Sequence, residues 1–562
     1  MNRVVHFTAA AGASLPWPVT VAVTISVIVR PVCRVVVLSL LLYVVTASAQ
    51  TVPPVPFSVE LVERRQVDAP ALHSSAVGVW EGRWLFLGGR ISGLHGFGSS
   101  PFPASGRNVS AVVYDPVLDR RWDAPLTSLP DTVAAALQTT NAQFHQHGRT
   151  LYVVGGYGHD PRLGDHRTFA TLTAVDVPGL IEAVVAGADP SRFVRQVVDE
   201  RLAVTGGHLL PLGERYYLLG GHRFDGLYLS GHSPRQQYTD AVRSFALVDD
   251  GDALTVEDFS EIHDAGALHR RDGNAAGIRY PDGTDGLALY GGVFSPTDLP
   301  YKTPVYVGPD GFVEDAGFEQ RIGHYTCPVL PIYDAATGAM HTVFFGGMGQ
   351  DYVDAATGAW ASDRYLPFID DVAVTTRAPG GATAETVLPW RMPGFLGTNA
   401  VLILADGVPH TETGVVLLEA LGETTLVGQI HGGIEATGRH PGVLGLGTSF
   451  ASARVFDVYV RVRRSSGTGG EELPGRLALS APAPNPARGS TRLTLTLHRP
   501  GPVAVEVFDA LGRRVLAPSP ERTLPAGPGE VRLDLETLPP GTYFVRVRSA
   551  DGVAARSFVH LP

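Results

Sequence analysis

The stretch Trp84-Leu85-Phe86-Leu87-Gly88-Gly89 runs a short apolar segment into a pair of glycines, and it decides the fold because the chain repeats it. Five further copies share this pattern and lie at residues 151–156, 216–221, 287–292, 342–347 and, less regularly, 427–433. The first glycines of successive pairs are 67, 65, 71, 55 and 86 residues apart. Self-similarity at this scale is typical of solenoids, propellers and arrays.

The remainder of each unit favours a propeller. Most pairs follow a turn such as Glu81-Gly82-Arg83, and another apolar segment precedes that turn. Further strand-like segments come after the pair, as at 109–115, followed by Arg121-Trp122. Four strands with the glycines at the end of the second predict a propeller blade, in which glycine is needed where neighbouring blades approach closely.

The combination of apolar strand, Gly-Gly, a later Tyr114-Asp115 and Trp122 resembles the kelch repeat of galactose-oxidase-type propellers. The resemblance implies an all-β, kelch-type β-propeller over residues 50–463, and the six glycine pairs predict six blades. We expect the segment from Phe57 to Arg64 to close the ring, and Ser452 to Val462 to supply closing strands. The spacings exceed the ~50 residues of a kelch repeat, so several blades must carry long loops, and a seven-bladed ring stays an alternative.

The first 49 residues are typical of a signal peptide. Arg30 and Arg34 precede an apolar run from Val35 to Val45, and Ala47-Ser48-Ala49 offers small residues for cleavage after Ala49. A second apolar stretch over residues 19–29 makes this leader long. Either the true start codon lies downstream, or the two stretches form an anchor.

The C-terminal region is predicted to be a separate module. Residues 464–475 are polar and glycine-rich, as in a flexible linker. Residues 476–562 contain short segments in which apolar and polar residues alternate, punctuated by glycine and proline. Period-two alternation at this spacing predicts a small antiparallel β-sandwich.

Three motifs of this module occur in a fixed order. They contain Pro484, Asn485 and Pro486, then Asp509, Leu511, Gly512 and Arg513, and finally Gly541 and Tyr543. Together they resemble the type A C-terminal sorting domain of the type IX secretion system, as in Bacteroidota. The resemblance implies the type IX machinery as a partner, export through the inner membrane, and delivery to the cell surface or the extracellular space. A sandwich used for adhesion is the alternative.

Charge and cysteine content exclude several classes of protein. The formal net charge is −11 and no basic run occurs, whereas a nucleic-acid binder needs a basic face. Of the two cysteines, Cys33 lies in the leader, which leaves Cys327 as the single thiol of the mature chain. One thiol excludes an intrachain disulfide and a CxxC zinc site. We predict no cofactor and no metal, and we expect a monomer.

The segments before the glycine pairs supply the candidate site, because they would form the innermost strands around the channel of a propeller. They carry polar groups where a packed core would be apolar. The candidates for ligand binding at the channel mouth are His73, Asn141, Gln143, His145, His208, His269, Arg270, Arg271, Asn274, His324 and Tyr325. Arginine forks bind carboxylates, so we predict a binding protein for a carbohydrate or an anionic ligand. Ordered water alone would also satisfy these groups.

Two other functions stay open. The first is a carbohydrate-active enzyme. Sialic-acid mutarotases depend on arginine and a carboxylate, and Arg270, Arg271 and Asp272 could take these roles. A copper oxidase resembling galactose oxidase needs a Tyr–Cys link, but Tyr325 and Cys327 are expected on one face of one strand, which does not suit that link. The second is a scaffold whose rim loops bind another protein.

Finally, Asp189 to Glu200 is predicted to form a short helix within the second unit of the repeat.

Overall fold

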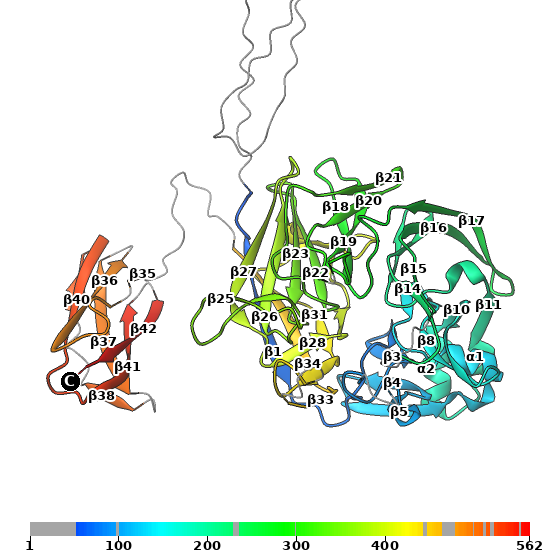
Figure 1. Ribbon diagram of the computed structural model, residues 1–562, viewed down its shortest axis with the longest axis horizontal. Coiled ribbons are helices and arrows are strands. Elements are labelled where there is room, and N and C mark those ends of the chain that lie inside the picture. The colour runs from blue at the N-terminus through cyan, green and yellow to red at the C-terminus, as the bar shows by residue number, and fades with distance from the viewer. Residues whose placement is uncertain are drawn as a thin grey trace, which may run out of the picture. The chain divides into compact units, whose positions relative to one another are not determined.

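The computed structural model describes residues 52–96, 101–228, 235–297, 299–441, 447–463, 478–480, 482–497, 500–509, 513–516, 522–525, 527–549 and 552–561. The chain divides into two compact units between Arg463 and Arg464 (Figure 1). The predicted signal peptide, 1–49, and the predicted linker, 464–475, lie outside the described residues. No helix in the described ranges has the length and apolar character needed to cross a membrane.

Six sheets of the first unit share one plan, in which four antiparallel strands lie side by side, and we number these six in chain order. Sheet 1 consists of β2 (Ala76–Trp80), β3 (Arg83–Leu87), β4 (Ser110–Asp115) and β5 (Arg120–Pro125). Sheet 2 consists of β6 (Gln143–His147), β7 (Thr150–Val154), β10 (Thr171–Asp176) and β11 (Val194–Val198). Sheet 3 consists of β12 (His208–Leu212), β13 (Arg215–Leu219), β16 (Ala241–Asp249) and β17 (Leu254–His263). The prediction that the chain is all-β is confirmed.

Sheets 4 to 6 repeat this order. Sheet 4 consists of β18 (Asn274–Arg279), β19 (Asp285–Tyr290), β20 (Val305–Gly308) and β21 (Gly311–Glu314). Sheet 5 consists of β22 (Val329–Asp334), β23 (Ala339–Phe345), β26 (Asp371–Arg377) and β27 (Thr383–Arg391). Sheet 6 consists of β29 (Val401–Leu404), β31 (Thr424–His431), β34 (Val455–Val462) and β1 (Phe57–Arg64). A short strand, β30 (Val416–Leu417), pairs in parallel with β22. In each sheet the second strand leads into a glycine pair.

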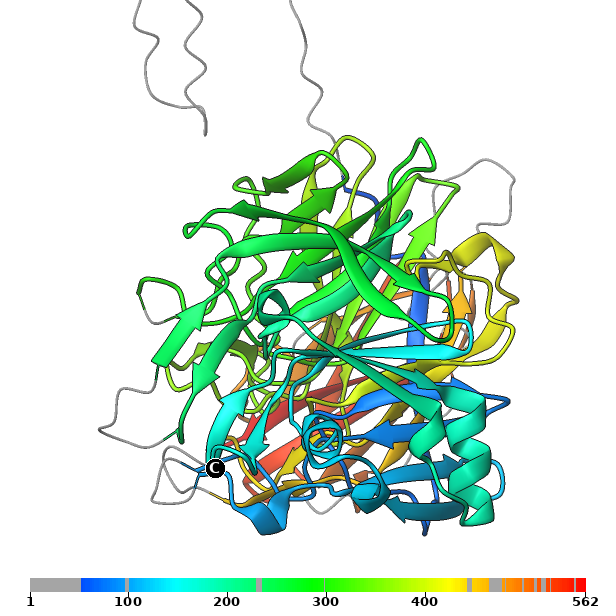
Figure 2. The same ribbon diagram turned by 90° about the vertical axis from the view of Figure 1, so that its right-hand side faces the viewer.

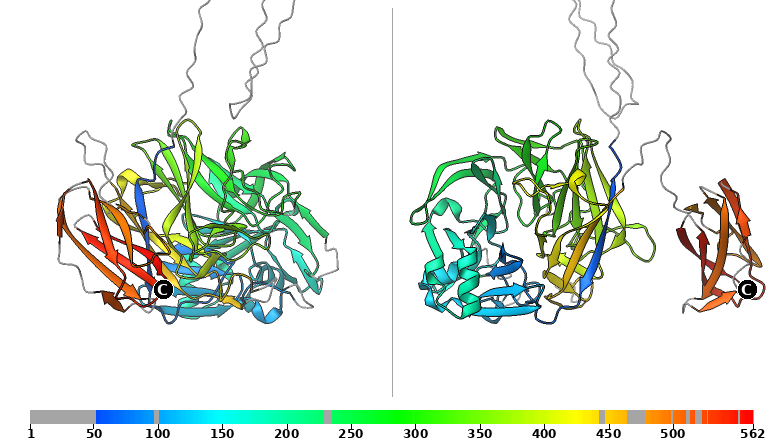
Figure 3. Two further views of the ribbon diagram at one scale, coloured as in Figure 1. Left: turned by 60° about the vertical axis from the view of Figure 1, so that its left-hand side comes forward. Right: turned by 180° about the vertical axis from the view of Figure 1, so that it is seen from behind.

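The sixth sheet joins the two ends of the unit. Its outer strand is β1, which pairs along its whole length with β34, so that Phe57 lies opposite Val462 and Arg64 opposite Val455. The blue β1 runs beside the yellow β34 in Figures 1 and 3, although almost 400 residues separate them. Phe57 and Val59 are buried in the hydrophobic core of this region. The segment predicted to close the ring thus belongs to the last sheet.

The glycine pairs lie where neighbouring sheets meet. All twelve glycines have positive φ values, for example +64° at Gly155 and +90° at Gly156. A Cβ on Gly155 would lie 2.0 Å from the carbonyl oxygen of Val204, just before sheet 3. The same relation closes the series, because a Cβ on Gly432 would lie 2.3 Å from the carbonyl oxygen of Leu72, just before sheet 1. The close approach that the sequence pattern implied is present.

One backbone hydrogen-bond ring connects all six sheets. It runs through six residues that each precede an innermost strand, and we call them the ring residues: Ser74, Asn141, Gly206, Asp272, Thr326 and Asn399. Each donates its N–H to the carbonyl of the ring residue of the preceding sheet, over 2.7–3.2 Å, and Ser74 closes the ring by donating to Asn399. All six have positive φ, a conformation that costs energy for residues other than glycine.

Additional strands follow the glycine pairs and account for the long spacings of the repeat. The hairpins β8 (Tyr157–Asp160)–β9 (Asp165–Thr168) and β14 (His222–Asp225)–β15 (Arg235–Tyr238) join into one sheet; β24 (Asp351–Val353) pairs with β25 (Trp360–Ser362); and β28 (Phe395–Thr398), β32 (Ile434–Ala436) and β33 (Ser449–Ala451) form a third.

The helix predicted over residues 189–200 is wrong. That segment contains a 3-10 turn, Ser191–Phe193, and then β11, which pairs with β10. Ladder hydrogen bonds to β10 outweigh the local capping signals there. Among the described residues the α-helices are α1 (Asp131–Ala136) and α2 (Val177–Ala186), with Gly187 at φ +65° ending α2. Figure 2 shows α2 beside the blue strands of sheet 1, which it contacts.

The second unit is a β-sandwich of two antiparallel sheets. One contains β35 (Ala478–Leu479), β36 (Ser490–Leu497) and β40 (Gly527–Asp534); the other contains β38 (Arg514–Leu516), β37 (Gly501–Asp509), β41 (Gly541–Ser549) and β42 (Gly552–His560), with β39 (Arg522–Leu524) also on β37. Along β41 the side chains of Tyr543, Val545 and Val547 are buried and their neighbours point outward. This is the alternation that the sequence showed.

Candidate functional site

Two cavities lie along the ring of hydrogen bonds and share ring residues. One, of about 260 Å³, is lined by the beginnings of innermost strands and is called the central cavity. The other, of about 90 Å³, is called the cup. Six cup residues, which we call the floor residues, each directly precede a ring residue: His73, Thr140, Thr205, Arg271, Tyr325 and Thr398.

The repeat itself places the floor residues. Each forms a backbone bridge with the residue that directly follows the glycine pair of its own sheet, as His73 does with Arg90 and Thr205 with His222. Arg90, Tyr157, His222 and Ile434, all in this second position, also line the cup. The sequence therefore does contain a signal for these four cup residues, because each of them directly follows a Gly-Gly pair. The sequence-based prediction covered only the residues that precede each glycine pair.

One linked group of three side chains in the cup carries both a positive and a negative charge, beside the Arg90 guanidinium that also lines the cup. The Arg271 guanidinium forms an ion pair with the Asp272 carboxylate, and the Tyr325 hydroxyl donates a hydrogen bond of 2.9 Å to the same carboxylate. Burial opposes the charge of Arg271, but the Asp272 carboxylate raises the pKa of Arg271 above its ordinary value. Burial and the same carboxylate raise the pKa of Tyr325. The cup therefore presents a fixed cation, a fixed anion and a protonated phenol.

The histidines of the cup are neutral. Burial, and secondly the charge of Arg90, lowers the pKa of His73 to about 3. Its Nε2 donates to the carbonyl of Ser92, so that Nδ1 accepts from the Ser74 hydroxyl. Burial, with the charge of Arg271, also lowers the pKa of His222 to about 3. Both rings thus act as uncharged hydrogen-bonding groups at pH 7.

Aromatic rings from the segments after the glycine pairs form part of the wall of the cup. Phe102 stacks on His95 at 4.8 Å between centroids and meets Tyr157 edge-on at 5.2 Å. Phe224 lies 5.3 Å from Tyr228 and 5.4 Å from Tyr157. These aromatic residues were not predicted from the sequence, because a single aromatic residue outside the repeated strand and glycine pair carries no periodic signal.

Several sequence-predicted residues do line the two cavities. His73, Asn141, Arg271 and Tyr325 line the cup, while Asn141, Gln143, His208 and Asn274 line the central cavity. In the central cavity these groups hold the sheets together: His208 donates to the carbonyl of Gly273, and the Asn274 side chain accepts from the N–H of Cys327 and donates to the carbonyl of His324.

Four predicted residues line neither cavity. Arg270, 1% exposed, points away from the cup and donates to the carbonyls of Ala267, Thr303 and Gly291. His269 donates to Asp240, His324 donates to the carbonyl of Gly346, and His145 packs against Tyr216. Adjacent residues thus diverge, because the chain turns sharply as it enters each ring residue.

Tyr325 and Cys327 do not share a strand face, in contrast to the sequence-based expectation. Between them Thr326 adopts a φ of +26°, so that Tyr325 lines the cup while Cys327 lines the central cavity. Burial raises the pKa of the Cys327 thiol to about 12. Within the described ranges, no cluster of three or more His, Cys, Asp or Glu side chains could hold a metal ion.

The motifs of the second unit meet at the ends of its strands. The Asn485 side-chain oxygen accepts from the N–H of Val559 in β42, and Asp509, the last residue of β37, forms an ion pair with Arg513 at 2.7 Å. Tyr543 donates to the carbonyl of Pro539. Leu511 and Gly512, both named in the predicted motif, lie outside the described residues.

Residues 483–560 match the family model described as the secretion system C-terminal sorting domain. The second unit is therefore a sorting domain, and such a domain indicates export by type IX secretion to the cell surface or the extracellular space. The predicted interaction with the type IX machinery is consistent with this domain.

Two solved structures are similar to the chain at 11% sequence identity each. One is titled as a novel fungal alcohol oxidase with catalytic diversity among the AA5 family, in complex with copper; the match covers 89% of this chain and 99% of that one, with a TM-score of 0.34. The other is a structure of YjhT, with 70% and 99% covered and a TM-score of 0.39. No curated protein matches the sequence. At these scores neither similarity bears on the ligand.

Proposed function

We propose that the first unit is a six-bladed β-propeller of an exported binding protein, and that its cup holds a small polyhydroxylated compound of about the size of a monosaccharide. The six sheets, the closed ring of hydrogen bonds and the glycine contacts from sheet 6 back to sheet 1 support six blades. The sorting domain supports export. The ligand class follows from the chemistry of the cup.

The observation that carries the proposal is the convergence of the six floor residues on one cavity. Three of them are threonines, one is a neutral histidine, and two belong to the Arg271–Asp272–Tyr325 group. A sugar hydroxyl both donates and accepts hydrogen bonds, so it can use the Asp272 carboxylate and the Arg271 guanidinium at the same time. Aromatic walls with a few convergent polar groups are typical of small-molecule sites.

The cup is large enough to hold ordered water that a ligand could displace. A volume of about 90 Å³ has room for several ordered waters, at roughly 10–15 Å³ each. A monosaccharide that entered would displace these waters and replace their hydrogen bonds with its own hydroxyls. Because the Arg271–Asp272 pair is already formed, little reorganisation is required.

A glycan and small-molecule binding screen on the mature chain, followed by calorimetry with two variants, tests this proposal. Tyr325→Phe removes one hydroxyl from the cup, whereas Tyr290→Phe removes a buried hydroxyl that contacts Thr342 outside the cup. Loss of a hydrogen bond to a charged group corresponds to about 1.5–3 kcal/mol, so we expect roughly tenfold or weaker binding for Tyr325→Phe alone. Equal affinities of both variants for every ligand found would exclude the cup.

A further inference from the structure

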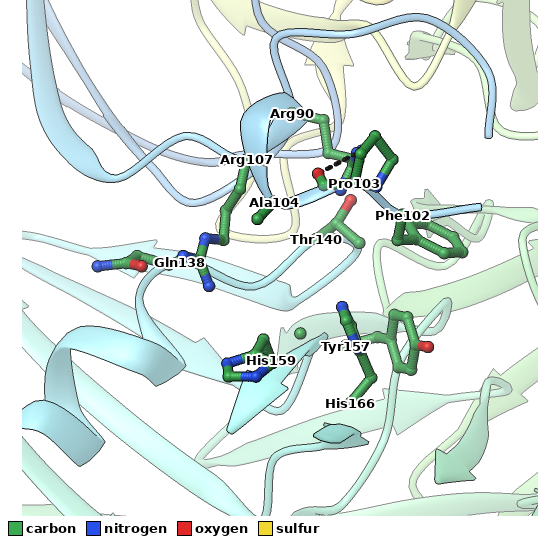
Figure 4. A pocket seen from close by; sticks show the side chains of 12 residues that line it. Arg90, Phe102, Pro103, Ala104, Arg107, Gln138, Thr140, Tyr157, His159 and His166 are labelled. Atoms are coloured by element: carbon green, nitrogen blue, oxygen red, sulfur yellow. Dashed lines mark hydrogen bonds between the residues drawn. The ribbon is translucent and has the colours of Figure 1, made fainter. Parts of the chain in front are cut away.

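A third cavity, of about 140 Å³, lies beside the cup and shares Arg90, Phe102, Thr140 and Tyr157 with it. We call it the side pocket. Figure 4 shows Arg90, Arg107 and the Pro103–Ala104 turn on one side of this pocket, with Tyr157, His159 and His166 on the other. Its lining includes two arginines and two histidines but no aspartate or glutamate.

Backbone pairing sets the two arginines next to each other. Arg90 and Arg107 face one another in an antiparallel bridge, and like charges that lie directly opposite in such a pair destabilise it. Within the described part of the chain, neither guanidinium forms an ion pair. The nearby carboxylate of Asp160 pairs with Arg167 instead, at 3.7 Å. Two adjacent positive charges thus line one cavity with no counter-charge from its walls.

The environment of Arg90 shows the cost of this arrangement. Arg90 is 6% exposed, and burial, followed by the charge of Arg107, lowers the pKa of its guanidinium to about 10. Its Nε donates to the Ser92 hydroxyl, its Nη2 donates to the carbonyl of Pro103, and its plane lies 5.1 Å from the Phe102 ring. These contacts hold the guanidinium in place beside the pocket.

Unused donors remain in the side pocket. Among the described residues, none accepts a hydrogen bond from Nη1 of Arg90, and the buried Nε of Arg107 has no partner. A buried N–H without an acceptor costs about 1–3 kcal/mol, and more where the group is charged. An oxyanion in the pocket would neutralise the repulsion and accept from both guanidinium groups, which favour bidentate contacts with planar or tetrahedral oxyanions.

We propose that the side pocket is an oxyanion site, in which Arg90 and Arg107 bind a carboxylate, sulfate or phosphate group. The anion has two possible sources: a free inorganic ion, or an acidic substituent of a compound whose neutral part occupies the adjoining cup. The site does not depend on the proposed ligand of the cup, because its lining is complete with Gly89, Arg90, 102–104, Arg107, Gln138, Thr140, 157–159 and His166.

Calorimetry on the mature chain with sulfate, phosphate, glucose and glucuronate, at constant ionic strength, tests the proposal. The variants are Arg107→Gln, Arg90→Gln and, as the matched control, Arg121→Gln, which removes an arginine charge from β5 of the same sheet, where Arg121 pairs with Asp123. We expect Arg107→Gln and Arg90→Gln each to weaken anion binding about tenfold or more, and Arg121→Gln to change it less than twofold. Binding of sulfate or phosphate identifies a free ion, whereas binding of glucuronate alone identifies an acidic substituent.

Thermal unfolding of Arg107→Gln adds a second measurement, which holds even if Arg90→Gln does not fold. Without oxyanions, Arg107→Gln should be at least as stable as the native chain, because the repulsion is gone. With sulfate or glucuronate, whichever binds, only the native chain and Arg121→Gln should gain stability. The proposal fails if none of the three anions binds at about 10 mM, ten times the 1 mM that corresponds to about −4.1 kcal/mol, or if Arg107→Gln and Arg121→Gln respond alike.

Discussion

Substituting Gly155 by alanine measures how closely neighbouring sheets approach. The new Cβ would lie 2.0 Å from the carbonyl oxygen of Val204, and the N–H of Gly156 donates to that same oxygen at 2.8 Å. Because backbone lines both sides of the contact, the sheets must separate to make room. Gly164 is the matched control: its φ is +63°, against +64° for Gly155, but no atom lies within 4 Å of its Cβ position.

The two variants share one cost and differ in another. A left-handed conformation costs alanine about 1–2 kcal/mol, partly offset by the lower entropy of the unfolded chain, so Gly164→Ala should lose about 1 kcal/mol of unfolding free energy. Gly155→Ala adds overpacking of about 1–3 kcal/mol and weakens a hydrogen bond of about 1 kcal/mol. We expect it to lose about 3–5 kcal/mol.

Tryptophan fluorescence during urea unfolding is the appropriate assay. Trp80, Trp84, Trp122, Trp360 and Trp390 are the tryptophans of the chain after residue 49, and all lie in the first unit. The signal therefore reports that unit and not the sorting domain. A loss for Gly155→Ala within about 0.5 kcal/mol of that for Gly164→Ala would refute the close-approach explanation of the glycine pairs.

Three further predictions follow from other parts of the chain. Arg270→Met should lower the unfolding free energy of the first unit by about 3–5 kcal/mol, since three backbone carbonyls lose a buried cationic donor. The affinity of the remaining folded protein for its ligand should stay unchanged in calorimetry. A large change in that affinity would place Arg270 at the binding site. Burial lowers the pKa of His73 to about 3 and that of His431 to about 4. Below pH 6.5 the unfolded chain therefore binds more protons than the folded chain. In urea unfolding, we expect the unfolding free energy to fall as the pH is lowered from 6.5 toward 4, by up to about 1.4 kcal/mol per pH unit for each histidine. His431→Gln should lessen this slope, and an unchanged slope would contradict the assignment. Deleting residues 478–562 should abolish delivery to the cell surface and medium in a host with type IX secretion, measured by fractionation, and undiminished delivery would contradict the role of the sorting domain.

The architecture was largely predictable from local patterns. Positive φ together with a close backbone contact leaves glycine as the residue that fits at Gly155 or Gly432, so each sheet-to-sheet contact leaves a mark in the sequence. The alternation in β41 likewise reports a sheet with one buried face. The helix prediction for residues 189–200 failed because proline and aspartate, which occur near the start of this segment, are also common in turns. The hydrogen bonds that make β11 a strand come from β10, a distant part of the chain.

The site was only partly predictable. The sequence alone indicated polar residues before the glycine pairs, an exported chain and a sorting domain, because those signals are local and repeat or occur in a fixed order. Only the tertiary structure separated Arg270 from Arg271, sending one guanidinium into the sheet packing and the other into the cup. Only the tertiary structure also brought Arg90 and Arg107 together. The physical reason is that a side chain's direction depends on the backbone turn into each ring residue, and that turn is set by hydrogen bonds between sheets and not by the residues next to it in sequence.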